Sequence, residues 1–151
     1  PRSLATPRAT LESVTHEWVG VIEAAGGEVW EHCDGGMLAC WTDAPVVADT
    51  IGTVVDATNS LRELTEQAGY RLSAGVAPGV ARLHVEDGRP PEGWELSGPF
   101  YLARWMMNLS AHRGRILLTE VGAKQVGEGR NALLGRVSIQ GNRYINLYEL
   151  T

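Results

Sequence analysis

The sequence predicts an α+β fold in which a mixed, largely antiparallel sheet is covered by helices. Segments whose apolar residues recur at helical spacing alternate with short segments rich in β-branched and aromatic residues. Several of the short segments come in pairs around turn residues, as at Gly141-Asn142, which is typical of antiparallel hairpins. The predicted order, α-β-β-α-β-β-α-β-α-β-β, belongs to the α+β class.

Length and composition predict one globular domain. The chain has 151 residues, of which 44% are hydrophobic and 21% charged, close to the averages for folded domains. Residues 1–9 carry two prolines and two arginines without periodicity, so we expect a flexible lead-in there. The expected domain then covers residues 10–151.

Charge and cysteine usage exclude several classes of protein. Thirteen Lys and Arg against eighteen Asp and Glu give a net charge of −5, the wrong sign for a general nucleic-acid binder. No apolar run is long enough for a membrane span, and nothing resembles a signal peptide. Cys33 and Cys40 do not make a disulfide framework, so we expect them to be reduced in a cytoplasmic protein. The histidines are scattered, and we expect no metal or other cofactor.

The first three predicted elements are a helix and a hairpin. Leu11, Val14, Trp18 and Ile22 recur at helical spacing, and Gly26-Gly27 is a stop signal. Two short segments then follow on either side of a turn made of Asp and Gly. They are residues 28–33 and 37–41, with Asp34-Gly35-Gly36 between them. This pattern predicts a strand, a tight turn and a returning strand.

A long helix and a second hairpin are predicted next. Asp43 is the expected N-cap, with Pro45 in the first turn, and the helix is expected to end near Gly69. Residues 71–77 and 80–85 alternate around Pro78-Gly79 and predict the hairpin, and residues 87–93 have loop composition.

The last third of the chain predicts two helices and three strands. Ser97 is the expected cap of a helix that runs to about Ala111. Residues 115–118 predict a short strand, and a small helix is expected to begin near Thr119. Two final strands, residues 133–140 and 143–150, flank the Gly141-Asn142 turn.

These segments resemble the catalytic domain of class III nucleotidyl cyclases, the adenylate and guanylate cyclases. Four motifs carry the resemblance, in the family's order and at nearly its spacing. They are GGEV with the turn and MLA at residues 26–39, LSAGVAPG at 72–79, GP at 98–99 with GRILLT at 114–119, and YINLYEL at 144–150. The resemblance implies a ferredoxin-like, cyclase-type sheet. The family's sheet also begins with a central strand that carries a metal-binding Asp, and residues 1–9 do not match that strand.

The resemblance also implies a reaction. In the family, the 3′-hydroxyl of a nucleoside triphosphate attacks the α-phosphate, with two metal ions held by two Asp. A Lys and an Asp read the base, and an Asn and an Arg one helical turn apart hold the ribose and the transition state. Both chains of a dimer contribute to each site.

In this chain the positions that match the family's hairpin residues have changed. The family's Lys falls on Glu31 and its metal-binding Asp on Gly35, with Asp34 one residue early. Because neighbouring strand residues point in different directions, that offset re-aims the carboxylate. The alternative is that Asp34 is a turn residue bonded to its own backbone.

The helix and loop positions have changed as well. The family's Asn falls on Leu102 and its Arg on Met106, neither of which supplies a charge or a hydrogen bond there. The base-reading Asp falls on Glu95. Arg104 and Asn108 are also four residues apart, but a shift of two residues turns a side chain to the other helix face, so we interpret them as solvent-facing.

The turn residues His32 and Cys33 also suggest a metal site or a thiol nucleophile. Adjacent residues of a regular strand point to opposite faces, so both cannot bind one ion. We therefore expect no catalytic or metal-binding residue in this chain, and interpret Glu31, Asp34, Gly35, Glu95, Leu102 and Met106 as a degenerate substrate site.

The functional hypothesis is a non-catalytic cyclase-homology domain that acts as a regulatory or dimerisation module in signalling. The expected partner is a second copy or another cyclase-type domain, in the cytoplasm. Two alternatives stay open: a diverged but active adenylate or guanylate cyclase, and a sensor that binds a small ligand in the altered cleft.

Overall fold

The structure is a computed structural model that describes residues 10–33, 35–41, 47–79, 98–139 and 143–151. Its helices are α1 (Leu11–Ala24), α2 (Val47–Gln67), α3 (Gly98–Met107) and α4 (Glu120–Val126), and a short 3-10 helix, η2, spans Ser110–His112. Its strands are β1 (Glu28–Cys33), β2 (Gly36–Cys40), β3 (Ala74–Val76), β4 (Ile116–Leu118), β5 (Asn131–Ile139) and β6 (Arg143–Leu150). The α+β prediction is confirmed.

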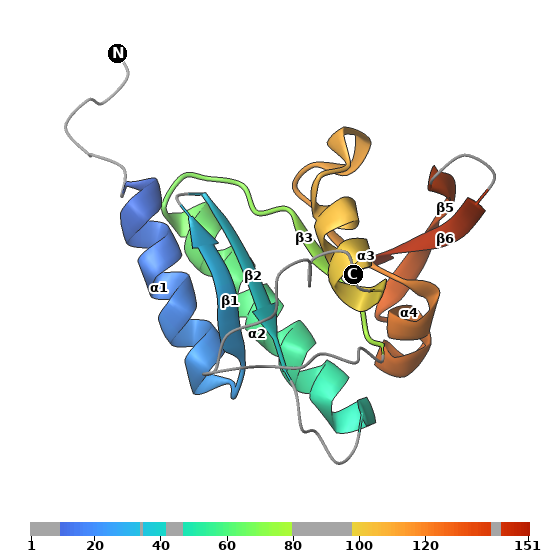
Figure 1. Cartoon of the computed structure of the whole chain (residues 1–151), viewed down its shortest axis with the longest axis horizontal. Coiled ribbons are helices and arrows are strands. Elements are labelled where there is room, and N and C mark those ends of the chain that lie inside the picture. Colours follow the sequence, from blue (N-terminus) through green and yellow to red (C-terminus); the bar gives the residue numbers. More distant parts are fainter. Residues whose placement is uncertain (1–9, 34, 42–46, 80–97, 140–142) are drawn as a thin grey trace.

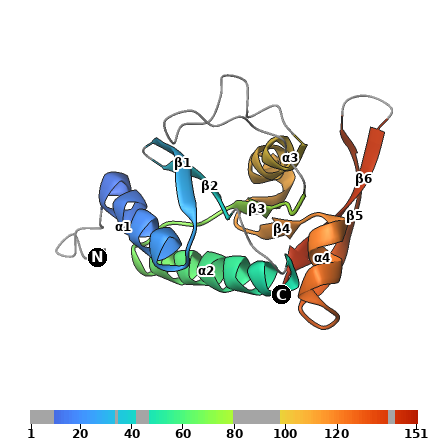
Figure 2. The same cartoon turned by 60° about the horizontal axis from the view of Figure 1, so that its bottom comes forward.

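Helices lie on both sides of the strands. In Figure 2, α1 and α2 run beneath the strands and α3 lies above β3, while α4 packs beside β5 and β6. Figure 1 shows the β5–β6 hairpin extending from the body on the side opposite α1. Within the described part of the chain, no helix is long and apolar enough to cross a membrane.

The predicted first helix and hairpin are both confirmed. The Thr10 side chain accepts a hydrogen bond from the Ser13 N–H at the start of α1, and Gly26 has a φ of +87° just after its end. Strands β1 and β2 pair antiparallel. The pairing contains a bulge, because Val29 faces Ala39 while Glu31 faces Leu38, which leaves Trp30 as an extra residue.

The predicted second hairpin is described only in its first half, so its pairing stays a prediction. Its second half, residues 80–85, lies outside the described residues, and its first half is the three-residue strand β3. Strand β3 pairs with β4, in parallel. The Ala74 N–H is donated to the Arg115 carbonyl at 3.1 Å. Pro78 has no N–H, so it cannot extend the ladder as a donor.

Among the described residues, the strands form two sheets rather than the single sheet expected. Strands β1 and β2 make one sheet, and the other has the order β3-β4-β6-β5. In the second sheet β4 pairs antiparallel with β6, and β6 antiparallel with β5. The sheets are therefore mixed and largely antiparallel, as predicted, but β2 and β3 are not neighbours in a ladder.

The third helix ends at Met107, not near Ala111. The Asn108 side chain donates to the Arg104 carbonyl at 2.9 Å, and its backbone N–H also turns back to Arg104 and Trp105. The next backbone N–H, of Leu109, bonds the Met106 carbonyl three residues back instead of the Trp105 carbonyl four residues back. The helix therefore stops there and η2 follows.

The remaining elements agree with the prediction. Helix α4 begins after Thr119, whose hydroxyl accepts a hydrogen bond from the Gly122 N–H, and the last two strands pair antiparallel. The expected caps and turn at Asp43, Pro45, Ser97 and Gly141-Asn142 lie outside the described residues.

The core is organised around β4. Ile116 and Leu118 pack in one cluster with α2, β3 and α4. Leu117 points to the opposite face and packs with Met106 of α3 and Leu147 of β6. A third cluster joins α1 to the chain before β3 through Trp18 and Leu72.

The close contact of α3 with β3 gives a stability prediction. A Cβ on Gly75 would lie 2.5 Å from the Ala103 carbonyl oxygen and 2.9 Å from Met106 Cβ. Because backbone cannot give way easily, we expect Gly75→Ala to lower the free energy of unfolding in urea by about 1–3 kcal/mol.

Gly20→Ala is the matched control for this substitution. Gly20 lies on an exposed face of α1 with nothing within 4 Å of a built Cβ, so we expect a gain of up to about 1 kcal/mol from helix propensity. Equal stability of the two variants would contradict the close packing of α3 on β3.

Candidate functional site

A cavity of about 890 Å³ lies between the two sheets. It is lined by every residue of β2 and by residues 72–79, which include all of β3. The central residues of α1 and α2 line one side, and α3 lines another. We call this space the central cavity.

The walls of the central cavity are mainly apolar. The helices below it contribute large apolar side chains, namely Trp18, Ile22, Ile51, Val54 and Leu61. Among the described lining residues, the charged groups are Glu28 and Arg104. A cavity of this size and composition suits an apolar occupant with a few polar contacts.

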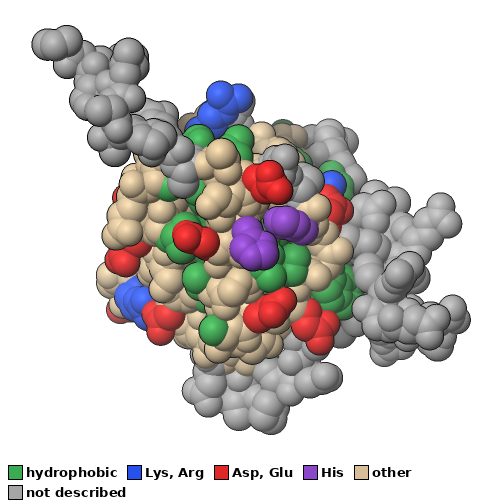
Figure 3. Space-filling model, turned by 90° about the vertical axis from the view of Figure 1, so that its left-hand side faces the viewer, with side chains coloured by type: hydrophobic (Ala, Val, Ile, Leu, Met, Phe, Trp, Pro, Cys, Tyr) green, Lys and Arg blue, Asp and Glu red, His purple; other side chains and the backbone are tan. Residues whose placement is uncertain are grey.

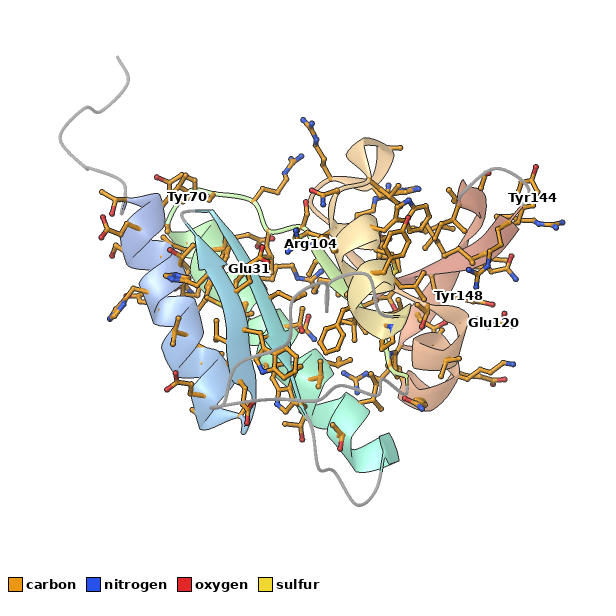
Figure 4. All side chains as sticks on the ribbon, in the orientation of Figure 1. Glu31, Tyr70, Arg104, Glu120, Tyr144 and Tyr148 are labelled. Carbon is orange, nitrogen blue, oxygen red and sulfur yellow. The ribbon has the colours of Figure 1, made fainter. Side chains whose placement is uncertain are left out.

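Two contacts tie the β1–β2 hairpin to α3. The Trp30 ring stacks on the Phe100 ring with centroids 5.2 Å apart. The Glu31 carboxylate accepts a hydrogen bond from the Arg104 guanidinium and forms an ion pair with it. Figure 4 shows these two charged side chains meeting between β1 and α3.

The bulge at Trp30 explains how two successive residues both reach α3. In a regular strand, Trp30 and Glu31 would point to opposite faces. The extra residue breaks this alternation and re-aims the side chains. No local sequence pattern indicates the bulge or either contact, since the partners are about seventy residues away.

The hairpin positions of the predicted degenerate site border the central cavity. Glu31 is 46% exposed at its side chain and holds Arg104, which is 38% exposed. Gly35 lines the cavity with a φ of +84°, a conformation that an Asp would adopt only with strain. Asp34 and Glu95 lie outside the described residues.

The two helix positions lie elsewhere. Met106 is 1% exposed and packs in the core against Leu117 and Leu147. Leu102 lines a different depression of about 420 Å³, together with Val121 and Tyr144. The structure therefore does not bring the four described positions together within one subunit.

Arg104 and Asn108 have specific partners in addition to solvent. Arg104 binds Glu31, and the Asn108 side chain donates to the Arg104 carbonyl. The prediction that Arg104 faces solvent is incomplete, because its guanidinium also binds Glu31 and lines the central cavity.

Thiol and metal chemistry find little support in the described residues. Among them, no group of three or more His, Cys, Asp or Glu side chains is arranged to hold a metal ion. Cys40 lines the central cavity. Burial, and then the nearby Glu28 carboxylate, raise the pKa of its thiol from 9.0 to about 12.

Among the described residues, the face around α1 shows no basic patch. Figure 3 shows acidic side chains spread over this face among polar atoms, histidine side chains next to each other near its centre, and described basic side chains that do not gather. The described part of this face therefore lacks the cluster of Lys and Arg that is typical of nucleic-acid-binding surfaces.

No family model matches the chain, and no curated protein matches it in sequence. Solved structures do match. The catalytic core of a rhodopsin-guanylyl cyclase with converted specificity, in complex with ATPalphaS, is similar with a TM-score of 0.64 and 17% identity over 95% of this chain and 80% of that chain.

Two further structures give the same result. The guanylate cyclase domain of RhGC from Catenaria anguillulae, in complex with GTP, has a TM-score of 0.58 and 16% identity over 95% of this chain and 82% of its own. An adenylate/guanylate cyclase/hydrolase from Silicibacter pomeroyi has a TM-score of 0.58 and 16% identity, covering 87% and 75%. The chain has the fold of class III cyclase catalytic domains, which confirms the resemblance at the level of fold.

The raised pKa of Cys40 predicts an unreactive thiol. The thiolate is the reactive form. In a Cys33→Ser variant at pH 8, we therefore expect Cys40 of the folded protein to react with iodoacetamide about tenfold or more slowly than Cys40 of the unfolded chain. This figure allows for the higher nucleophilicity of a more basic thiolate. The reaction rate should rise only as the pH approaches 12.

A Glu28→Gln variant tests the electrostatic part of this shift. Loss of the carboxylate should lower the pKa of Cys40 and speed its alkylation, although burial remains the larger cause. A folded-state rate equal to that of the urea-unfolded chain would contradict the half-buried position of the thiol.

Proposed function

We propose that this chain is a non-catalytic cyclase-homology domain that acts as a regulatory and dimerisation module in signalling. One observation carries the proposal: Met106, at the position where the resemblance expects the transition-state Arg, is 1% exposed and packs in the core. A side chain there reaches no substrate without a rearrangement of α3.

The charge beside the cavity supports the same proposal. Glu31 occupies the position of the base-reading Lys, and it already neutralises Arg104. A triphosphate would have to displace Glu31 from Arg104. Even at an effective dielectric of about 20, an unlike pair changed to a like pair at about 4 Å costs several kcal/mol, and each kcal/mol of barrier is about fivefold in rate.

Dimerisation is supported by an apolar surface on and beside the β5–β6 hairpin. Leu133 is 59% exposed on β5 and Tyr144 is 52% exposed on β6, and Val121 of α4 is 52% exposed. Tyr144 and Val121 also line the depression that contains Leu102. Figure 4 shows Tyr144 far out on this hairpin. The pair that shares this depression, Val121 and Tyr144, and the exposed Leu133 on the same hairpin favour association.

The first prediction concerns activity. We expect the protein, incubated with ATP or GTP and Mn²⁺, to form no cyclic nucleotide above the buffer control, because the Arg and Lys positions of the family's site hold Met106 and Glu31. Calorimetry should detect no micromolar nucleotide binding.

Carboxylate variants make the activity test specific. Cyclic product that Asp34→Ala abolishes, while the matched surface variant Asp56→Ala retains it, would establish a diverged active cyclase instead. Tight nucleotide binding without turnover would overturn the electrostatic argument and favour a ligand sensor.

The second prediction concerns oligomeric state. We expect a dimer by light scattering, and we expect Leu133→Arg to weaken it on the order of tenfold or more, because a buried unpaired charge at an interface is costly. The matched control is Leu11→Arg, since Leu11 is 43% exposed on α1. A protein that stays monomeric at high concentration would remove the dimerisation role.

A further inference from the structure

Three arginines lie at the end of the larger sheet where β3 and β4 begin. Arg71 precedes β3, and Arg113 and Arg115 precede β4. Figure 2 shows these two strands side by side, and they run in the same direction, so the chain enters both of them at one end of the sheet. We call Arg71, Arg113 and Arg115 the arginine edge.

Two contacts hold the chain before β3 against the chain before β4. The Gly114 N–H donates to the Ser73 hydroxyl at 2.8 Å. A Cβ built on Gly114 would lie 2.5 Å from Arg71 Cδ and 3.2 Å from its Nε. The stem of the Arg71 side chain therefore lies against the glycine that separates Arg113 from Arg115.

Gly114 allows the Arg71 side chain to come this close. Its φ is +78°, a conformation that glycine adopts without strain, and a Cβ would occupy the space that the Arg71 stem uses. The fold thus brings positive groups together at one place. Because like charges repel, an anion bound between them stabilises the arrangement.

Two of these arginines have no carboxylate partner among the described residues. Arg115 forms an ion pair with Glu149 at 3.6 Å. Arg71 and Arg113 are exposed, and the ion pairs found in the described part of the chain involve neither of them. The arginine edge is therefore a local positive surface on a chain whose net charge is −5.

We propose that the arginine edge binds an acidic peptide segment of a partner protein, with one carboxylate held by Arg71 and a second by Arg113. The planar guanidinium group binds a carboxylate through two parallel hydrogen bonds. Neighbouring strands lie about 4.8 Å apart, and alternate residues of an extended peptide about 7 Å apart. Two carboxylates of one short segment can therefore reach both side chains.

The surroundings of the arginine edge favour a peptide over other anions. Neither the central cavity nor the depression beside Leu102 is lined by any of the three arginines. An open surface suits a segment that binds through several groups, whereas a small ligand requires a concave site. A nucleic acid requires a broader positive surface than three arginines on an acidic chain provide.

The inference does not depend on the proposed non-catalytic role. An acidic segment can bind the arginine edge of an active or an inactive domain alike. The edge also shares no residue with the apolar surface of Leu133, Tyr144 and Val121 that supports dimerisation. Its failure would therefore leave the activity and dimer tests untouched.

Titration of the protein with a synthetic acidic peptide tests the binding. The probe is acetyl-Asp-Glu-Asp-Glu-Asp-amide, and the control is acetyl-Asn-Gln-Asn-Gln-Asn-amide, which has nearly the same shape without the charge. With the probe, we expect the NMR signals of the Arg71 and Arg113 Nε–H groups to shift. Since the contacts are ionic and exposed, the affinity should fall on the order of tenfold between about 20 and about 200 mM salt.

Charge variants assign the binding to the edge. We expect Arg71→Gln and Arg113→Gln each to weaken binding of the probe about fivefold or more, and Arg71→Lys to weaken it less, because the charge remains but the planar fork is lost. The matched control is Arg143→Gln, which removes the same charge from an exposed position on β6. It should leave the affinity within about twofold.

Three results would overturn the proposal. Equal losses in Arg143→Gln and Arg71→Gln would indicate diffuse attraction by the whole surface. Binding of the uncharged peptide as tightly as the probe would remove the role of the carboxylates. Inorganic phosphate or a single-stranded oligonucleotide that binds more tightly than the probe, through the same two arginines, would assign the edge to phosphate groups.

Discussion

The three residues of β4 hold the described part of the molecule together. Ile116, Leu117 and Leu118 are all fully buried, and their alternation sends two side chains to the cluster below the sheet and one to the cluster above it. The same strand pairs in parallel with β3 and antiparallel with β6. The position of α3 over β3, and with it one wall of the central cavity, depends on this strand, because Met106 packs on Leu117.

Local sequence patterns predicted most of the helices and strands. They failed where contacts with residues distant in the sequence determine the structure. Helical periodicity identified α1, and Thr119 was recognised as the start of α4. The parallel pairing of β3 with β4 joins segments some forty residues apart. No local turn motif indicates this pairing. At the early end of α3 the Asn108 side chain bonds the Arg104 carbonyl and the Leu109 N–H turns to Met106, local bonds that composition does not reveal.

The residue types at the candidate site could be predicted, but their surroundings could not. Alignment by motif identified Met106 and Leu102 as the changed positions, and the structure adds that one packs in the core while the other borders a separate depression. Arg104, interpreted as solvent-facing, holds Glu31 across the edge of the central cavity. That contact depends on how the hairpin is placed over α3, which is a property of the assembled fold.

The bulge at Trp30 shifts the alternation of side-chain directions along β1 by one residue. The bulge reverses which of the odd- and even-numbered residues face which side of the hairpin. Val29 and Glu31 are both odd-numbered, yet they lie opposite the neighbouring residues Ala39 and Leu38 of β2. Loss of Trp30 would join Val29 directly to Glu31 and leave Glu31 opposite Leu38, so the later side chains would keep their faces. A one-residue insertion or deletion elsewhere in the strand, with no bulge to accommodate it, would instead move the Glu31 charge from the cavity edge to solvent without any substitution.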